Sequence, residues 1–140
     1  MSVHAALVAY LKTVSAVTAL VGSGSAARIR PFERLQGESL PAITYFNVDG
    51  NVDGMWGGHP ALTRSRIQID CWSDEHEESL TLLAAIRAAT DGFTGTFAST
   101  LVQGARIAEI REDFERAKVG GGTSDTEWFR QSIDWIVWHN

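Results

Sequence analysis

Apolar residues near the start of the chain recur close to the spacing of one helical face. Ser2 can cap the first turn, and Ser15 could begin a separate short helix over residues 16–20. Gly22 and Gly24 supply a helix stop and a turn. The start of the chain therefore predicts one amphipathic helix, or two short ones. The recurring apolar residues are Leu7, Tyr10, Leu11, Val14, Val17 and Val21.

Three extended segments follow this helical region. Residues 28–30 form a short one that Pro31 stops, because proline cannot donate to a central ladder. Residues 42–48 are rich in strand formers. Residues 63–72 alternate most cleanly, with isoleucine and Cys71 on one side and arginine, glutamine and aspartate on the other. This alternation predicts a strand with one buried face and one wet face.

The second half of the chain predicts one helix and two more strands. Acidic residues begin the segment 73–92, where Ser73 or Asp74 can act as the cap. Residues 93–104 form a connection rich in glycine and threonine, and residues 106–116 alternate again. The last strand, 127–139, places Trp135 on the core face, and Ile136 and Trp138 on the other.

The order of these segments predicts the fold class. Strands that are separated by loops favour antiparallel pairing, with the helices packed on one side. We therefore expect an α+β fold with two layers, in which a mainly antiparallel sheet of about five strands carries two main helices on one face. The 140 residues are expected to form one domain.

Composition narrows the function classes. The chain has 12 Lys and Arg against 17 Asp and Glu, so its formal net charge of −5 disfavours a protein that grips nucleic-acid backbones. The single Cys71 excludes an internal disulfide framework and favours a reducing compartment. Polar residues interrupt the apolar stretch 5–22, and no basic segment precedes it. We expect a soluble, intracellular protein without a membrane partner.

Candidate catalytic chemistry is sparse. Residues 49–54 resemble the first half of a calcium loop, but the twelfth position of that loop falls on Pro60, so an oxygen-rich turn is the preferred interpretation. The acidic cluster 74–78 fits a helix start better than a metal site. Cys71 falls among buried isoleucines, where a thiol is inert. We expect no catalytic residue, no metal and no cofactor.

Aromatic residues mark the candidate contact surface. Trp56 lies in a polar, glycine-rich segment, and four other apolar residues fall on strand faces opposite the predicted core. Tryptophans left in water are a liability unless they anchor a subunit interface. The alternative is that the first helix or a loop covers them. The candidate interface residues are Trp56, Trp72, Trp128, Ile136 and Trp138.

Four segments taken together resemble the tail-completion proteins of long-tailed bacteriophages, the tail terminator or tail-to-head joining family, which also occurs in prophages and gene transfer agents. The segments are residues 6–31, Leu40–Tyr45, Arg66–Trp72 with the acidic helix start behind it, and Trp128–Trp138. Their order and spacing carry the resemblance, which spans nearly the whole chain.

The resemblance implies a structural virion protein rather than an enzyme. Members form a ring, commonly a hexamer, that caps the head-proximal end of the tail tube, ends tube polymerisation and presents the head-attachment surface. The implied partners are copies of the chain itself, the major tail tube protein and a head-completion or connector protein. DNA would pass through the lumen without specific binding, and assembly would take place in the host cytoplasm.

Two glycine-rich segments are candidate partner-contacting loops that could order when the tube or the head arrives. We predict a flexible loop over residues 118–125, and a long exposed loop or a mobile hairpin tip over residues 49–60. Their candidate contact residues are Asp49, Asn51, Asp53, His59, Gly120, Gly121 and Gly122.

Three alternatives remain open at this point. The chain could be another head-tail connector, such as a head-completion, stopper or minor tail protein. It could be a small metal- or thiol-dependent enzyme, or a small intracellular binding domain.

Overall fold

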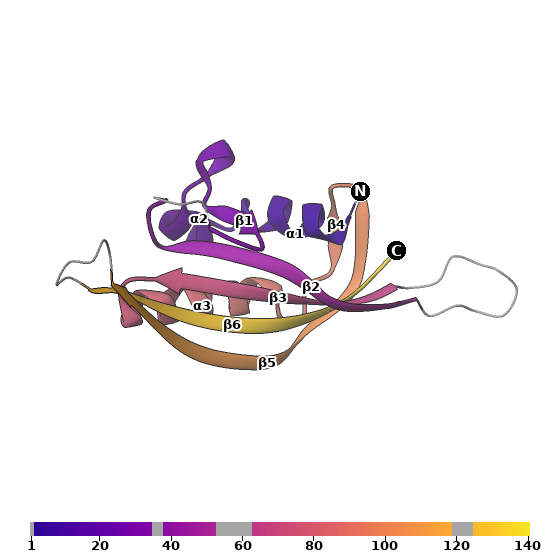
Figure 1. The fold of residues 1–140 in the computed structure, drawn as a ribbon. Helices are drawn as coiled ribbons and strands as arrows, with labels where there is room; N and C mark the ends of the chain where they lie inside the picture. Colours follow the sequence, from indigo (N-terminus) through magenta and orange to yellow (C-terminus); the bar gives the residue numbers. More distant parts are fainter. Residues whose placement is uncertain (1, 35–37, 53–62, 119–124) are drawn as a thin grey trace, which may run out of the picture.

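The computed structural model describes residues 2–34, 38–52, 63–118 and 125–140. Within them lie three α-helices, one short 3₁₀ helix and six strands (Figure 1). In chain order these are α1 (Val3–Leu11), α2 (Ser15–Val21), η1 (Gly24–Ala26), β1 (Ile29–Pro31), β2 (Ala42–Val52), β3 (Thr63–Ser73), α3 (His76–Thr90), β4 (Gly95–Phe97), β5 (Thr100–Lys118) and β6 (Asp125–His139).

All six strands belong to one sheet, in the order β1-β2-β3-β6-β5-β4. Every neighbouring pair is antiparallel except β1 and β2, which are parallel. The α+β class is confirmed, but the sheet is mixed because of its one parallel pair. Three α-helices are present within the described residues where two main helices were expected, because the N-terminal helical region is divided in two. The expected number of about five strands is too low, because β4 lies inside the predicted connection 93–104 and forms a hairpin with the start of β5.

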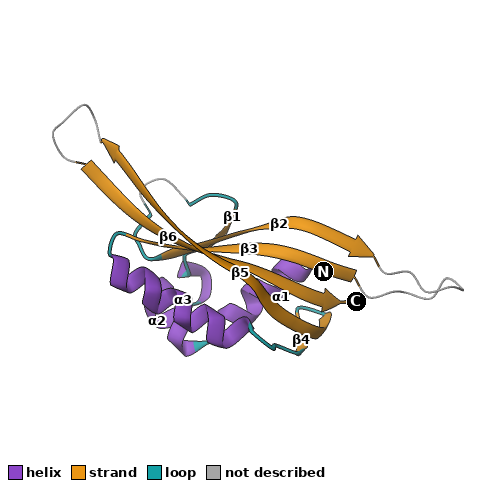
Figure 2. Cartoon of the chain, turned by 90° about the horizontal axis from the view of Figure 1, so that it is seen from below, coloured by secondary structure: helices purple, strands orange, loops and turns teal. Residues whose placement is uncertain are grey.

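The three α-helices lie on one side of the sheet (Figure 2). Isoleucines from β2, β3 and β6 form the floor of the core, and leucines from α1 and α3 pack on them. Trp135 on β6 is 1% exposed, and its indole Nε1 donates to the carbonyl of Thr90 at 2.9 Å. The core face that was predicted for the last strand is therefore confirmed.

The N-terminal region forms two helices, the second of the two arrangements predicted. Ser2 caps α1 as expected, since its hydroxyl accepts from the amide of Ala5 at 3.3 Å. The second helix begins at Ser15, but its cap is Val14, without a side-chain hydrogen bond. Gly22 follows this helix with φ 89°, a conformation that L side chains rarely adopt.

Ser73 organises the start of α3. Its hydroxyl accepts from the amide of Glu75 at 3.1 Å and donates to the carboxylate of Glu78 at 2.8 Å. The acidic residues of the first turn, Glu77 and Glu78, lie where the helix dipole favours negative charge. The helix begins at His76, its N-cap residue is Glu75, and no side chain caps it. The cap predicted at Ser73 or Asp74 is therefore wrong, because Ser73 contacts the N-cap residue itself and lies two residues before it, too early to cap the helix.

Two strands are longer than the sequence indicated. β2 continues to Val52, so Asp49 and Asn51 are strand residues and not part of a loop. β5 begins at Thr100, six residues before the predicted start. Its register against β6 shifts between Val102 and Gly104 and between Ile107 and Glu109, and bulges of this kind let a long strand bend.

No single helix in the described ranges is long and apolar enough to span a membrane. α1 and α2 meet the test only as a pair, and the pair is bent by 86°.

Candidate interaction surfaces

The face of the sheet that carries no helix, called here the open face, is built around one buried carboxylate. Asp134 on β6 has 3% of its side chain exposed. Arg111 on β5 donates to both of its oxygens, at 2.8 and 3.0 Å, and Arg66 on β3 donates from Nε at 3.1 Å. Hydrogen bonds from Arg111, and next from Arg66, lower the pKa of Asp134 although burial opposes the shift.

The network continues across the open face. Ser132 donates to Asp70 at 2.6 Å, and Gln68 donates to the same oxygen at 2.9 Å. Arg111 also donates to the amide oxygen of Gln68 at 3.1 Å. An ionised carboxylate that is saturated by donors is a poor proton acceptor, so this arrangement is suited to holding the face together rather than to acid–base catalysis.

The tryptophans of the open face are covered by arginines. The guanidinium of Arg34 lies 4.7 Å from the ring centroid of Trp72 and 5.3 Å from that of Trp128, and Arg130 lies 5.2 Å from Trp72. The indole of Trp72 donates to the hydroxyl of Thr44 at 2.9 Å. These cation–π contacts shield both rings from water and leave them half-buried.

The exposure expected for the apolar residues of this face is therefore corrected. Ile136 is 4% exposed, and Trp72, Trp128 and Trp138 are half-buried. Part of the cover comes from a loop, as the alternative predicted, because Arg34 belongs to the connection between β1 and β2. Arg130 of β6 adds a second arginine over Trp72. An interface role for the three tryptophans stays a prediction, and Ile136 is too buried to anchor a partner without rearrangement.

The two edges of the sheet have strand backbone that no other described strand pairs with. β1 is only three residues long and pairs with Ile43–Tyr45, which leaves the rest of β2 without a strand on its outer side within the described ranges. At the opposite edge, β4 pairs with residues 100–102 of the nineteen-residue β5. Unpaired strand edges can pair with another chain, and proteins leave them open only with protection or with a partner.

The exposed large apolar side chains of the described residues lie at these edges and not on the open face. Phe32, directly after β1, is 72% exposed, and its ring stacks on Phe46 of β2. Alternation along residues 106–116 places Ile110 and Phe114 together on one face of the strand, but this local pattern cannot show where the helical layer ends. The five are Phe32, Val48, Leu101, Ile110 and Phe114.

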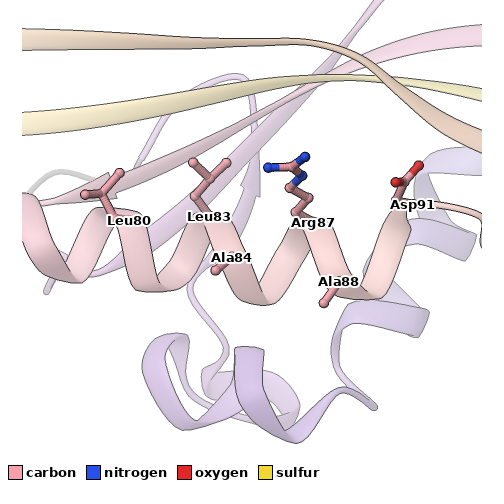
Figure 3. A pocket seen from close by; sticks show the side chains of 6 residues that line it. All are labelled: Leu80, Leu83, Ala84, Arg87, Ala88 and Asp91. Carbon is pink, nitrogen blue, oxygen red and sulfur yellow. The ribbon is translucent and has the colours of Figure 1, made fainter.

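The hollow along α3 does not resemble an active site. It has a volume of about 470 Å³ and is lined by residues of α3 and its C-terminal end (Figure 3). Arg87 and Asp91 are the only charged residues that line it. Catalytic sites bring reacting groups together from several elements, and this surface draws on one helix.

The other chemical candidates are not assembled into a site. Cys71 is fully buried, and burial raises the pKa of its thiol, as expected from its place among isoleucines. His76 contacts Glu112 across the surface, not Cys71. Within the described ranges, no three His, Cys, Asp or Glu side chains are grouped as metal ligands. Asp49 and Asn51 lie along β2 opposite arginines of β3.

Several predicted contact residues lie outside the described part of the chain. These are Trp56, Asp53, His59, Gly120, Gly121 and Gly122. Their proposed loop roles stay predictions.

Comparison with known proteins identifies related sequences and folds. The sequence profile of the family described as tail completion protein gp17 matches residues 5–139. Among solved structures, a chain from the "Virion of native gene transfer agent (GTA) particle" has a similar fold, with a TM-score of 0.69 and 14% sequence identity. The alignment covers 99% of this chain and 94% of that one. No curated protein matches the sequence.

Proposed function

This chain belongs to the tail completion protein gp17 family, and on that premise we propose that it forms a ring, a homohexamer, that caps the head-proximal end of a tail tube. As a family member it is a structural protein of a phage or phage-like virion tail, and it is not an enzyme. The resemblance inferred from the sequence is confirmed at the level of the family.

The unlike edges of the sheet are the observation that carries the ring proposal. One edge ends in the short, parallel β1, and the other in the long β5 with its β4 hairpin. A two-fold symmetric dimer uses the same surface of both copies, so a contact between these two unlike edges cannot form one. The unlike edges can instead join copies head to tail, with the β1 edge of one copy against the β5 edge of the next. Head-to-tail contacts close into a ring when the rotation between copies divides a full turn.

In this role the ring ends tube polymerisation and presents the surface to which the head attaches. Its partners are further copies of the chain, the major tail tube protein and a head-completion or connector protein. The chain would join the particle in the host cytoplasm and remain at the head-proximal end of the tail.

The charge of the chain supports a passive DNA conduit. The net charge of −5 disfavours tight binding of phosphates. On the open face, Arg66 and Arg111 already form ion pairs with the carboxylate of Asp134, so they are less available to bind phosphates. DNA would therefore pass through the lumen without being held.

Tails made without this chain provide the test. We expect overlong tubes without heads in electron micrographs, and antibody labelling of wild-type tails only at the head-proximal tip. Tails of normal length beside separate filled heads would instead identify a head-completion or stopper protein. Label along the tube or at its distal end would contradict the capping role.

A further inference from the structure

Residue pairing across the sheet places particular residues of the two edges at the same level. Pro31 of β1 pairs with Tyr45, Tyr45 with Ile69, Ile69 with Ile133, and Ile133 with Ile110 of β5. Pro31 and Ile110 are therefore the two ends of a single row. A ring axis that runs along the strands would keep rows level and would place Pro31 of one copy at the level of Ile110 of the next.

The outer edge of β5 is accessible at this level. β4 covers residues 100–102, and the turn after α3 covers the next stretch, where Gly92 donates to Ala105 at 3.0 Å and Asp91 accepts from Ile107 at 3.4 Å. From residue 109 onward, no other described strand lies on this side of β5. Ile110 is 38% exposed there, although it points to the same side of the sheet as the core residue Ile133.

The β1 edge offers a matching cavity. A cavity of about 180 Å³ opens beside Phe32, which is the most exposed large apolar residue of the described chain. Burial, and next the charge of His139, lower the pKa of His4 in its wall, which favours the neutral ring in an apolar contact. The lining residues are His4, Pro31, Phe32, Tyr45, Phe46 and Asn47.

The two edges differ in the charged residues of their sequences. Residues 28–34, around β1, include three arginines and one glutamate. Residues 109–114 of β5 include three carboxylates and one arginine. Many of these charges are already paired within the chain: Arg30 with Glu38, Glu109 with Arg66 and Arg111, and Asp113 with Arg130. They add little attraction between copies, so the contact depends on the apolar residues of the two edges.

We propose that neighbouring copies join edge to edge, with Ile110 on β5 of one copy packed into the cavity beside Phe32 at the β1 edge of the next. The occupant of each edge is thus a second copy of this chain. This inference rests on the proposed ring and specifies its contact. Side chains form most of this contact, because β1 offers three residues of backbone and one is a proline.

Crosslinking in assembled tails tests the contact. Tails are assembled in the producing host with the double variant Phe32→Cys/Ile110→Cys, purified, and treated with a short bis-maleimide. We expect a ladder of covalent multimers up to the size of the ring. Each single variant should give no multimers, because a head-to-tail contact places no residue opposite its own copy. The native Cys71 is fully buried and should not react.

A matched control uses Leu101, which is 41% exposed on the same strand but lies beside β4. Phe32→Cys/Leu101→Cys should give no ladder. Phe32→Cys/Ala108→Cys provides a second pair if Ile110→Cys tails do not assemble, because Ala108 is an exposed residue next to the proposed contact.

The outcomes separate this inference from the proposed function. Capped tails that carry the double variants but give no ladder would overturn the edge contact and leave the ring intact. Dimers from Ile110→Cys alone would show that two β5 edges meet, which also overturns it. Wild-type tails that lack the chain at their head-proximal tip would instead overturn the proposed function.

Discussion

The open face and the edges of the sheet differ in how their apolar residues are protected from water. Both present apolar residues that the helices do not cover. On the open face, arginines lie over Trp72 and Trp128, and Asp134 is saturated by donors. At the edges, Phe32 and Ile110 remain in contact with water. The comparison teaches that a face with a complete set of internal partners contributes to folding, whereas an edge with exposed apolar side chains is suited to assembly.

The largest effect that sharpens this comparison is expected at the helix-covered face. Trp135→Ala should lower the free energy of unfolding by about 3–5 kcal/mol, because it empties a fully buried site. Trp138→Ala, on the open face where Trp138 is half-buried, should cost about 1–2 kcal/mol. Denaturant titration of the two variants measures both losses. Equal losses of stability in the two variants would contradict the assignment of faces.

A smaller effect on stability is expected at the centre of the open face. Asp134→Asn should cost about 2–3 kcal/mol at neutral pH, because two partly exposed arginines lose their counter-charge. The lowered pKa of Asp134 stabilises the fold above the unfolded value, near pH 4, and this stability is lost as the pH falls through the folded pKa.

Denaturant titrations between neutral pH and about pH 2 provide the measurement. The Asn variant should lose less stability than the wild type on acidification. An identical pH dependence in both proteins would show that the network does not hold this carboxylate.

The smallest effect on folding is expected at the edge. Ile110→Ser should change the free energy of unfolding by less than about 0.5 kcal/mol, as exposed positions do. Its self-association, or its incorporation into tails, should fall at least about tenfold, which corresponds to about 1.4 kcal/mol of contact energy. Leu101→Ser, of similar exposure, is the control and should assemble normally. If Leu101→Ser also lost assembly, the loss in Ile110→Ser could not be assigned to the proposed edge contact.

The sequence predicted the faces of the strands well. The alternation of Ile67, Ile69 and Cys71 with polar residues places the first set in the core, as observed. Strand formation depends on this local pattern, which a single sequence contains. The parallel pairing of β1 with β2 depends on contacts between distant segments, and β4 is a three-residue strand defined by its partner. Neither could be predicted from local pattern alone.

The candidate contact surface was predicted less well, for a physical reason. Alternation identifies the side of a strand but not what lies above it. Ile136 falls on the polar side as predicted, yet it is 4% exposed. Its cross-strand neighbours are Arg66 and Arg106, and side chains as long as arginine can cover an apolar neighbour. Ile110 falls on the core side, yet it lies in a part of β5 that the helical layer leaves exposed.

The short β1 has a consequence for fidelity of construction. A long, regular edge strand would form backbone hydrogen bonds with any exposed strand of another chain, and such pairings dissociate slowly. Three residues ending in Pro31 offer too little backbone for that. A subunit bound in the wrong position would dissociate quickly. A correctly closed ring would persist, because each subunit is then bound to a neighbour on both sides.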